Sequence, residues 1–318
     1  MSNNSKVMTM SDAIAKYVAD GDSVFLPWGE PSSSCAAAHE IIRQGKKDLT
    51  VYTIGMSGWA DPLFFGKTIK RVVFGWIGSE LVGLSQIFRR RIEQGTLEFE
   101  DYANVHVAMM LWGGKLGLPC IPFPIETGSD LLKKKGCLGD KKYSVMDCPF
   151  TGQQLVLLPT FQPDVAIIHV QRSDTQGNAQ SWGTIVEYKS ELQLGSKKII
   201  VQAEEIVDDD IIEHDPDRTV CPAYKVCAVV EEPWGSHPEG MYGLYDKDLA
   251  FLLYYEKSTH NDDDAKKWMD EWIFGVKNRE EYIEHYIRKF GYGKLARLKV
   301  KPFYSASVNY GRPLKEVY

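Results

Sequence analysis

The sequence predicts an open α/β fold in which a mostly parallel sheet lies between two layers of helices, with a helical C-terminal part. The segment Val165–Val170 is short, apolar and rich in β-branched residues, as is typical of a strand buried on both faces of a parallel sheet. Helix and strand signals alternate from the N-terminus onward. The 318 residues contain no linker, repeat or low-complexity tract, so we expect one domain over residues 1–318, helical from about residue 249.

The N-terminal half supplies the alternating signals. Ser11 and Asp12 are candidate cap residues for a first helix, and Gly21 is the residue that ends it. Further helices are expected over 35–43 and 83–94, and strands over 23–26, 49–54 and 69–76. Residues 105–111 fit a helix or a strand by periodicity. We favour a helix, because residues 118–122 then supply the next strand.

The C-terminal half begins at the central strand. Residues 172–178 turn the chain after it, and Gly177 adopts positive φ there at no steric cost. We expect an acidic helix to open over 204–209 and amphipathic helices with many aromatic residues over 249–290. The remaining strands are expected over 154–159, 198–203 and 228–230.

The turn after the central strand is the first place to expect a ligand. In open α/β sheets, ligands collect at the carboxyl ends of the strands. A mouth is therefore expected near Gln171 and Asn178. His169 lies inside the strand, and we interpret it as a hydrogen-bonded core histidine, because a buried imidazole needs a partner. The alternative is that His169 is a ligand of the bound molecule.

Composition excludes several classes of partner. A net charge of −6 argues against nucleic acid and anionic membranes. The basic runs 89–91 and 133–135 are expected to be solvated helix faces. The six cysteines show neither a CxxC pair nor zinc-ligand spacing, which favours mostly buried thiols in a reducing cytoplasm. Residues 1–10 lack the apolar core of a signal peptide, and no run has transmembrane length, so we expect a cytoplasmic, soluble protein.

The common nucleotide and hydrolase motifs are missing. Gly195–Lys198 lacks the upstream glycine of a phosphate-binding P-loop. Trp112–Gly117 is no dinucleotide fingerprint, because its glycines are misplaced and it follows a predicted helix. No HExxH, GxSxG or kinase signature occurs either. These residue patterns therefore predict no self-sufficient catalytic constellation and do not identify a reaction.

Seven short segments form a set spread over nearly the whole chain: 6–9, 12–18, 40–45, 48–50, 164–169, 235–238 and 242–246. Together they resemble the alpha (A) subunit of the family I CoA-transferases, most closely the glutaconate CoA-transferase type. The resemblance implies one member of a hetero-oligomer that moves CoA between an acyl-CoA and a carboxylic acid. It also implies a partner, the CoA-transferase beta (B) subunit, whose glutamate attacks the acyl-CoA and forms a glutamyl-CoA thioester. The CoA thioester would be a substrate, with no cofactor, metal or nicotinamide.

The same resemblance implies substrate-binding residues but no catalytic residue in this chain. Ser79 falls where the family carries a strand-end serine thought to hold the substrate carboxylate, and a helix N-terminus suits that anion. The alternative is that Ser79 is a simple N-cap. Gly128 and Ser129 belong to a loop similar to a family loop near the cleft. Glu80 imitates part of the family's Ser-Glu-Asn-Gly nucleophile motif, but we interpret it as a solvated acid at a helix start.

One departure from the family pattern concerns the first strand-end loop. The family has Gly-Gly-Phe where this sequence reads Leu26-Pro27-Trp28, and a proline where it reads Ser34. Losing glycines and gaining an indole would reshape the pocket wall, so Trp28 and Gly29 are expected to line the acyl pocket. Trp28 as a core residue is the alternative. The change puts glutaconate in doubt as substrate and suggests a larger or more aromatic acyl group.

Two other functions stay open. A related group of hydrolases resembles these transferases but opens rings in steroid-degradation CoA thioesters, with a glutamate contributed by the alpha subunit. That glutamate corresponds here to Asn104, which cannot serve as a base. Alternatively, the chain is a non-catalytic protein that binds acyl-CoA. A partner that carries the glutamate would favour the transferase, and a partner without it would leave a binder.

Overall fold

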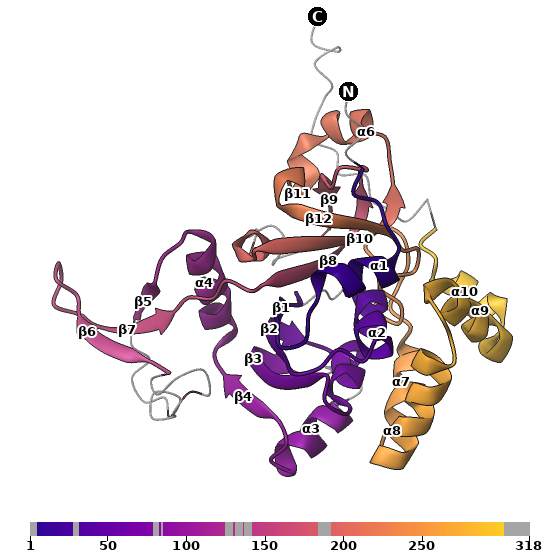
Figure 1. Cartoon of the computed structure of the whole chain (residues 1–318), viewed down its shortest axis with the longest axis horizontal. Helices are drawn as coiled ribbons and strands as arrows, with labels where there is room; N and C mark the ends of the chain where they lie inside the picture. The colour runs from indigo at the N-terminus through magenta and orange to yellow at the C-terminus, as the bar shows by residue number, and fades with distance from the viewer. Residues whose placement is uncertain are drawn as a thin grey trace, which may run out of the picture.

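The computed structural model describes residues 5–27, 32–78, 83, 85–124, 130, 136, 142–183 and 192–301. Within them, seven parallel strands form the body of a large mixed sheet, in the spatial order β12-β10-β8-β1-β2-β3-β4 (Figure 1). Two short strands, β9 (Ala179–Gln180) and β11 (Thr219–Cys221), extend the end of β8 in antiparallel pairing. The seven are β1 (Ser23–Phe25), β2 (Leu49–Met56), β3 (Ile69–Ile77), β4 (Glu98–Asp101), β8 (Val165–Ser173), β10 (Lys198–Ile206) and β12 (Val226–Glu231).

Helices cover both faces of this sheet. One face packs against α1 (Met10–Tyr17), α2 (Cys35–Arg43), η1 (Gly58–Phe64), α3 (Gln86–Glu93) and the C-terminal helices. The opposite face packs against α4 (Asn104–Lys115) and η3 (Leu192–Gly195). The C-terminal helices are α7 (Leu249–Lys257), α8 (Asp262–Met269), η6 (Asp270–Phe274), α9 (Arg279–Phe290) and α10 (Tyr292–Leu298). Short helices α6 (Asp209–Glu213), η4 (Pro216–Arg218) and η5 (Ala223–Lys225) lie between β10 and β12.

A second, smaller sheet projects from the body as an arm (Figure 1). Its three antiparallel strands have the order β5-β7-β6. They are β5 (Cys120–Pro124), β6 (Ser144–Asp147) and β7 (Gln154–Pro159). The predicted strands over 118–122 and 154–159 are therefore confirmed, but they pair with each other instead of joining the parallel sheet.

The central strand is as predicted. Residues 165–170 of β8 are all buried, and β8 lies between β1 and β10 in parallel register. Two separate apolar clusters lie on the two faces of the sheet, so the three-layer α/β/α fold and the helical C-terminal part are confirmed. That the whole chain forms one domain stays a prediction. Among the helices of the described residues, none combines the length and apolar character that a membrane span requires.

Two local predictions are wrong. The acidic helix expected over 204–209 is strand up to Ile206, because Glu205 and Ile206 pair with the end of β8. Of the basic run 89–91, only Arg89 is a solvated side chain, with 57% of it exposed. Arg90 Nη1 donates to the Thr259 carbonyl at 2.8 Å, and Arg91 Nη1 donates to the Ile69 carbonyl at 2.8 Å. The second basic run, 133–135, lies outside the described residues.

Candidate functional site

The carboxyl ends of β1, β2, β3, β8, β10 and β12 meet at one edge of the sheet, here named the carboxyl edge. The predicted site residues Trp28, Gly29 and Ser79 lie outside the described residues. The strands that precede them in the sequence are described. Trp28 and Gly29 follow β1, Ser79 follows β3, and β2 lies between these two strands. The Gly78 N–H donates to the Met56 carbonyl at 3.0 Å, which fixes the start of the loop that carries Ser79.

Of the other residues predicted at the site, the structure describes some and leaves others outside the described residues. Gly128 and Ser129 follow β5 of the arm and lie outside the described residues. Gln171 is buried, and its Nε2 donates to the carbonyls of Trp182 and Tyr242 at 2.9 and 3.2 Å. Asn178 Oδ1 accepts the Ala223 N–H at 3.0 Å. Gln171 and Asn178 thus hold neighbouring loops together at the end of β8.

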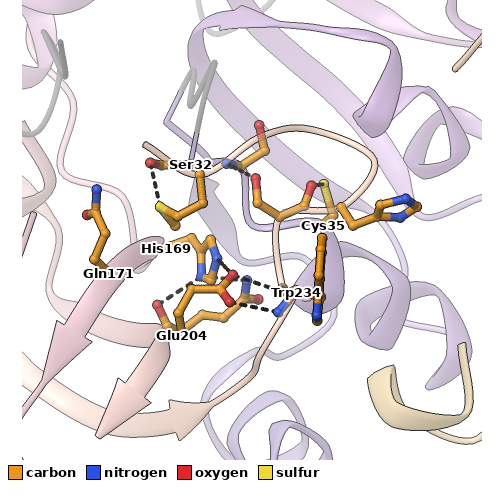
Figure 2. A network of polar contacts seen from close by, with 12 residues as sticks. Ser32, Cys35, His169, Gln171, Glu204 and Trp234 are labelled. Carbon is orange, nitrogen blue, oxygen red and sulfur yellow. Dashed lines mark hydrogen bonds and ion pairs between the residues drawn. The ribbon is translucent and has the colours of Figure 1, made fainter. Parts of the chain in front are cut away.

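His169 belongs to a buried polar network (Figure 2). The sequence predicted that this histidine is buried and hydrogen-bonded, but it did not predict the partner Glu204. His169 Nε2 donates to Glu204 Oε1 at 2.8 Å, and its Nδ1 lies 2.8 Å from Gln202 Nε2 and 3.1 Å from the Gln202 carbonyl oxygen. The Glu204 carboxylate further accepts the N–H groups of Trp234 and Gly235, at 2.7 and 3.1 Å, and the Tyr245 hydroxyl. The prediction of a hydrogen-bonded core histidine is confirmed. Glu204 was missed because its segment was predicted as a helix.

Glu204 anchors the segment Glu232–Gly240, here named the connecting loop, which follows β12. This loop reaches the loops after β1 and β2. Its Ser236 Oγ accepts the Ser33 N–H at 2.8 Å, and its Gly240 carbonyl accepts the Ser32 N–H at 3.0 Å. Three strand-end loops are therefore held in one arrangement by hydrogen bonds between residues far apart in the chain.

The carboxylate that completes this arrangement is Glu239. It is fully buried, and its Oε1 accepts the Ser57 hydroxyl at 2.7 Å. Its Oε2 lies 2.9 Å from Lys247 Nζ, so an ion pair with one partner fully buried lies beside the loop after β2. The sequence gives no signal that a single acidic residue in a loop will join residues of other loops, as Glu239 does. The Gly235–Pro238 segment, which contributed to the family resemblance, was the nearest available hint.

Cys35 and His237 are not activated for catalysis. Cys35 Sγ lies 2.9 Å from the Ser236 carbonyl, and burial raises the pKa of its thiol, so it stays protonated. Burial lowers the pKa of His237 to about 4, although the hydrogen bond to Asp248 acts in the opposite direction. In the described part of the carboxyl edge, the carboxylates of Glu204 and Glu239 are already engaged by donors.

Asn104 is the first residue of α4 and packs against β3. A Cβ atom on Gly75 would lie 2.2 Å from Asn104 Oδ1, so only glycine at that position allows this approach. The residue itself is exposed near the carboxyl edge. A carboxamide does not take up a proton at neutral pH, so Asn104 cannot act as a general base.

A cavity of about 760 Å³ lies behind the connecting loop, between α1, α2 and the start of α9. Arg279 crosses from α9 and donates through Nε and Nη2 to the Trp234 carbonyl at 2.8 and 2.6 Å. Glu232 also lines this cavity. Burial raises the pKa of Glu232 to about 7, despite the opposing charge of Arg279.

The fold is that of a known enzyme class. The sequence pattern of the coenzyme A transferase family matches residues 7–232. The chain therefore belongs to the coenzyme A transferase family and is a CoA-transferase of the alpha-subunit type. The connecting loop after Glu232 and all the C-terminal helices lie beyond the matched residues.

Several individual members of this class are similar to the chain. The chain is 36% identical to the A subunit of glutaconate CoA-transferase from Acidaminococcus fermentans, over 94% of this chain and 96% of the relative. The crystal structure of that enzyme superimposes with a TM-score of 0.86 and 34% identity, covering 98% of this chain and 100% of the other. The A subunit of 3-oxoadipate CoA-transferase from Pseudomonas knackmussii is 34% identical, over 87% of this chain and 96% of the relative. The cholesterol ring-cleaving hydrolase IpdA subunit of Rhodococcus jostii is 21% identical, over 91% and 98%.

Proposed function

We propose that this chain is the alpha subunit of a hetero-oligomeric CoA-transferase that exchanges CoA between an acyl-CoA and a carboxylic acid. The observation that carries the proposal is the identity of 36% to the corresponding chain of a glutaconate CoA-transferase, over nearly the full length of both chains. The CoA thioester enters as a substrate, and no bound cofactor takes part. The free thiols of the described cysteines are compatible with a cytoplasmic location, and neither nucleic acid nor membrane is a partner in this proposal.

In this proposal a glutamate of the beta subunit is the nucleophile. Its carboxylate attacks the thioester carbonyl, which releases CoA as a thiolate and leaves a mixed anhydride. The thiolate then attacks the glutamyl carbonyl of that anhydride, releasing the first carboxylic acid and forming the glutamyl-CoA thioester. The second acid reverses these two steps and leaves as the new acyl-CoA. The engaged state of Glu204 and Glu239 supports a nucleophile from another chain.

This chain supplies one wall of the acyl pocket. Ser79 contacts the substrate carboxylate, and Trp28 and Gly29 line the acyl group, with Gly128 and Ser129 nearby. Gly78, the residue before Ser79 in the sequence, lies at the carboxyl edge next to the end of β2, which supports this role for Ser79. The indole of Trp28 favours a larger or more aromatic acyl group than glutaconyl. A preference for small diacyl-CoAs in a series of acyl-CoA substrates would count against that specificity.

An exposed apolar surface supports the need for a beta subunit. Helix α4 is apolar all round, which is typical of a helix covered on both sides. One side packs on the sheet, whereas Val105, Trp112 and Leu116 are 47%, 39% and 50% exposed at helical spacing. Phe150, at the tip of the arm, is 93% exposed. Since α4 begins at the carboxyl edge, a partner docked on this surface also reaches the active site.

Trapping of the intermediate tests the proposal. The chain is purified with its partner, incubated with an acyl-CoA, treated with borohydride or hydroxylamine and analysed by mass spectrometry. We expect one modified glutamate in the partner. Modification of Glu80 would reverse the roles of the two chains. Release of free CoA without an adduct would favour the hydrolase, and neither turnover nor an adduct across an acyl-CoA series would favour a non-catalytic binding protein.

The hydrolase is the weaker alternative. The IpdA relative is 21% identical to this chain, whereas two transferase relatives exceed 30%. Asn104, at the position aligned with the hydrolase glutamate, has no acid-base function. Replacing Asn104 with Glu offers a separate check, because gain of thioester hydrolysis in that variant would mean that the pocket is already arranged for the hydrolytic reaction.

A further inference from the structure

The cavity behind the connecting loop is large enough to hold a small molecule. Its volume of about 760 Å³ lies within the range of about 300–1,000 Å³ that small-molecule sites occupy. The described residues that line it include none from the loops after β1, β2 and β3, where the proposed acyl pocket lies. The proposed reaction therefore gives this cavity no role.

Glu232, the first residue of the connecting loop, is half-buried in the wall of the cavity. Its backbone is fixed, because its N–H donates to the Ala203 carbonyl at 2.7 Å and its own carbonyl accepts the Gly235 N–H at 2.9 Å. Its carboxylate, by contrast, forms no hydrogen bond or ion pair with any described residue. A carboxylate withdrawn from bulk water is costly without a partner, and burial accordingly raises the pKa of Glu232 to about 7.

The two guanidinium groups that line the cavity do not supply the missing partner. Arg279 donates through Nε and Nη2 to the Trp234 carbonyl, and its Nη1 is shielded from solvent. Arg43 Nη1 pairs with Glu40, and Arg43 Nε donates to two backbone carbonyls at 3.1 and 2.9 Å. Glu232 is therefore left with a charge that a bound cation would balance.

The exposed part of the lining is acidic. Its charged residues are Glu231, Glu280, Glu284 and Lys277. Lys277 Nζ lies 3.2 Å from Glu281, and Glu284 lies 3.6 Å from Arg288 Nη1. Glu231 and Glu280 form no ion pair with a described residue. Since a cleft lined by one sign of charge concentrates ions of the opposite sign, this lining favours cations over anions.

The rest of the lining suits a short apolar chain. It includes the side chains of Met10, Pro233 and Ile283 and the rings of Trp234 and Tyr282. Methylene groups pack against such side chains, and aromatic rings also attract cations. We propose that the cavity binds a short alkylammonium ion whose charged group pairs with the Glu232 carboxylate. The inference does not depend on the proposed function, because no reacting group takes part.

The test is an NMR titration of the full chain with n-butylammonium chloride at pH 8 and constant ionic strength. The uncharged probe 1-butanol has the same length, and we expect it to bind at least about tenfold more weakly, because it leaves the charge of Glu232 unpaired. Absence of butylammonium binding, or equal affinity for the two probes, would overturn the inference.

Variants assign the charged contact to one residue. Glu232→Gln removes the charge at constant size and should weaken butylammonium binding at least about tenfold. Glu280→Gln is the matched control, because it removes a carboxylate from the exposed lining, and it should change the affinity less than about threefold. Glu232→Asp keeps the charge and should retain more affinity than Glu232→Gln. Wild-type affinity in Glu232→Gln would contradict the inference.

Glu232 is also the group of this cavity that should control how binding depends on pH. Burial lowers the pKa of His39 far below its ordinary value and raises that of Tyr282, so both side chains stay neutral. The charged groups that act on the pKa of Glu232 are Arg279, Glu40, Glu204 and Arg43. Because a cation pairs with the ionised carboxylate, affinity should increase as the pH rises through 7.

The same titration at two pH values measures this effect. An alkylammonium ion keeps its charge between about pH 6 and pH 8, as a lysine side chain does. With a Glu232 pKa of about 7, the affinity for butylammonium should rise about tenfold over that interval. The rise should be absent in Glu232→Gln. If it persisted in that variant, another group would bind the cation and the inference would be wrong.

Discussion

The carboxylate of Glu239 accepts a hydrogen bond from the Ser57 hydroxyl at 2.7 Å, although 182 positions separate the two residues in the chain. The contact joins the loop after β2 to the connecting loop after β12. The second oxygen of Glu239 lies 2.9 Å from Lys247 Nζ, so an ion pair with one partner fully buried stabilises the junction. The carboxyl edge is therefore built from the N-terminal and C-terminal halves of the chain together.

Breaking this pair should destabilise the fold. We expect Glu239→Gln to lower the free energy of unfolding by about 2–4 kcal/mol, because Lys247 keeps its charge without a counter-charge. The measurement is urea unfolding at pH 7. Glu93→Gln is the matched control, since Glu93 pairs with Arg89 where both side chains are more than half exposed. It should change stability by less than about 0.5 kcal/mol. Equal effects would mean that burial of Glu239 has no energetic consequence.

Glu204 and Glu205 are adjacent in β10 but have different environments. Glu204 accepts hydrogen bonds from a histidine, a tyrosine and two backbone N–H groups, whereas Glu205 is exposed. We expect Glu204→Gln to cost about 2–4 kcal/mol, because a carboxamide offers one acceptor oxygen where a carboxylate offers two. Glu205→Gln should cost less than about 0.5 kcal/mol. Thermal unfolding of both variants checks this difference, and similar melting temperatures would contradict it.

The raised pKa of Glu232 predicts that the stability of the folded protein depends on pH. Its folded pKa, about 7, lies above the ordinary value of 4.5, so the folded state binds the proton more tightly than the unfolded chain. Stability from this group is therefore complete below pH 4.5 and is lost as the pH rises toward 7. Glu232→Gln should stabilise the protein by about 1–3 kcal/mol at about pH 8 and have little effect at about pH 4.5.

Urea unfolding at the two pH values tests this assignment. Glu280→Gln is the control, because Glu280 lines the same cavity but is exposed. Its effect should be small and similar at both pH values. A Glu232→Gln variant that is less stable than the wild type at the higher pH would show that the charged carboxylate stabilises the cavity.

The exposed side of α4 predicts where the beta subunit docks. Replacing Trp112 and Leu116 with Gln should weaken the complex at least about tenfold, since large apolar side chains dominate protein interfaces. Phe274→Gln is the control, because Phe274 is 53% exposed on the C-terminal helices instead. Co-purification and analytical ultracentrifugation measure the effect. Retention of the complex by the double variant would move the interface elsewhere.

Local sequence patterns were sufficient for much of the fold. Helix α2 occupies Cys35–Arg43 as predicted, because its apolar spacing and the following Gly45 are strong local signals. Residues 165–170 form the central strand for the same reason. The expected helix over 204–209 is wrong because pairing of Glu205 and Ile206 with β8 outweighs local propensity. Likewise, strand signals alone could not tell that β5 and β7 form their own sheet.

For this protein the sequence by itself determined the α/β class, the order of its central elements and, through seven dispersed segments, the family. Only the tertiary structure decided which polar residues meet at the carboxyl edge. Ser57 with Glu239, His169 with Glu204, and Asp61 with Tyr255 are pairs 35 to 194 positions apart. Periodicity records which residues lie on one face of one element, whereas these contacts depend on how separate elements pack.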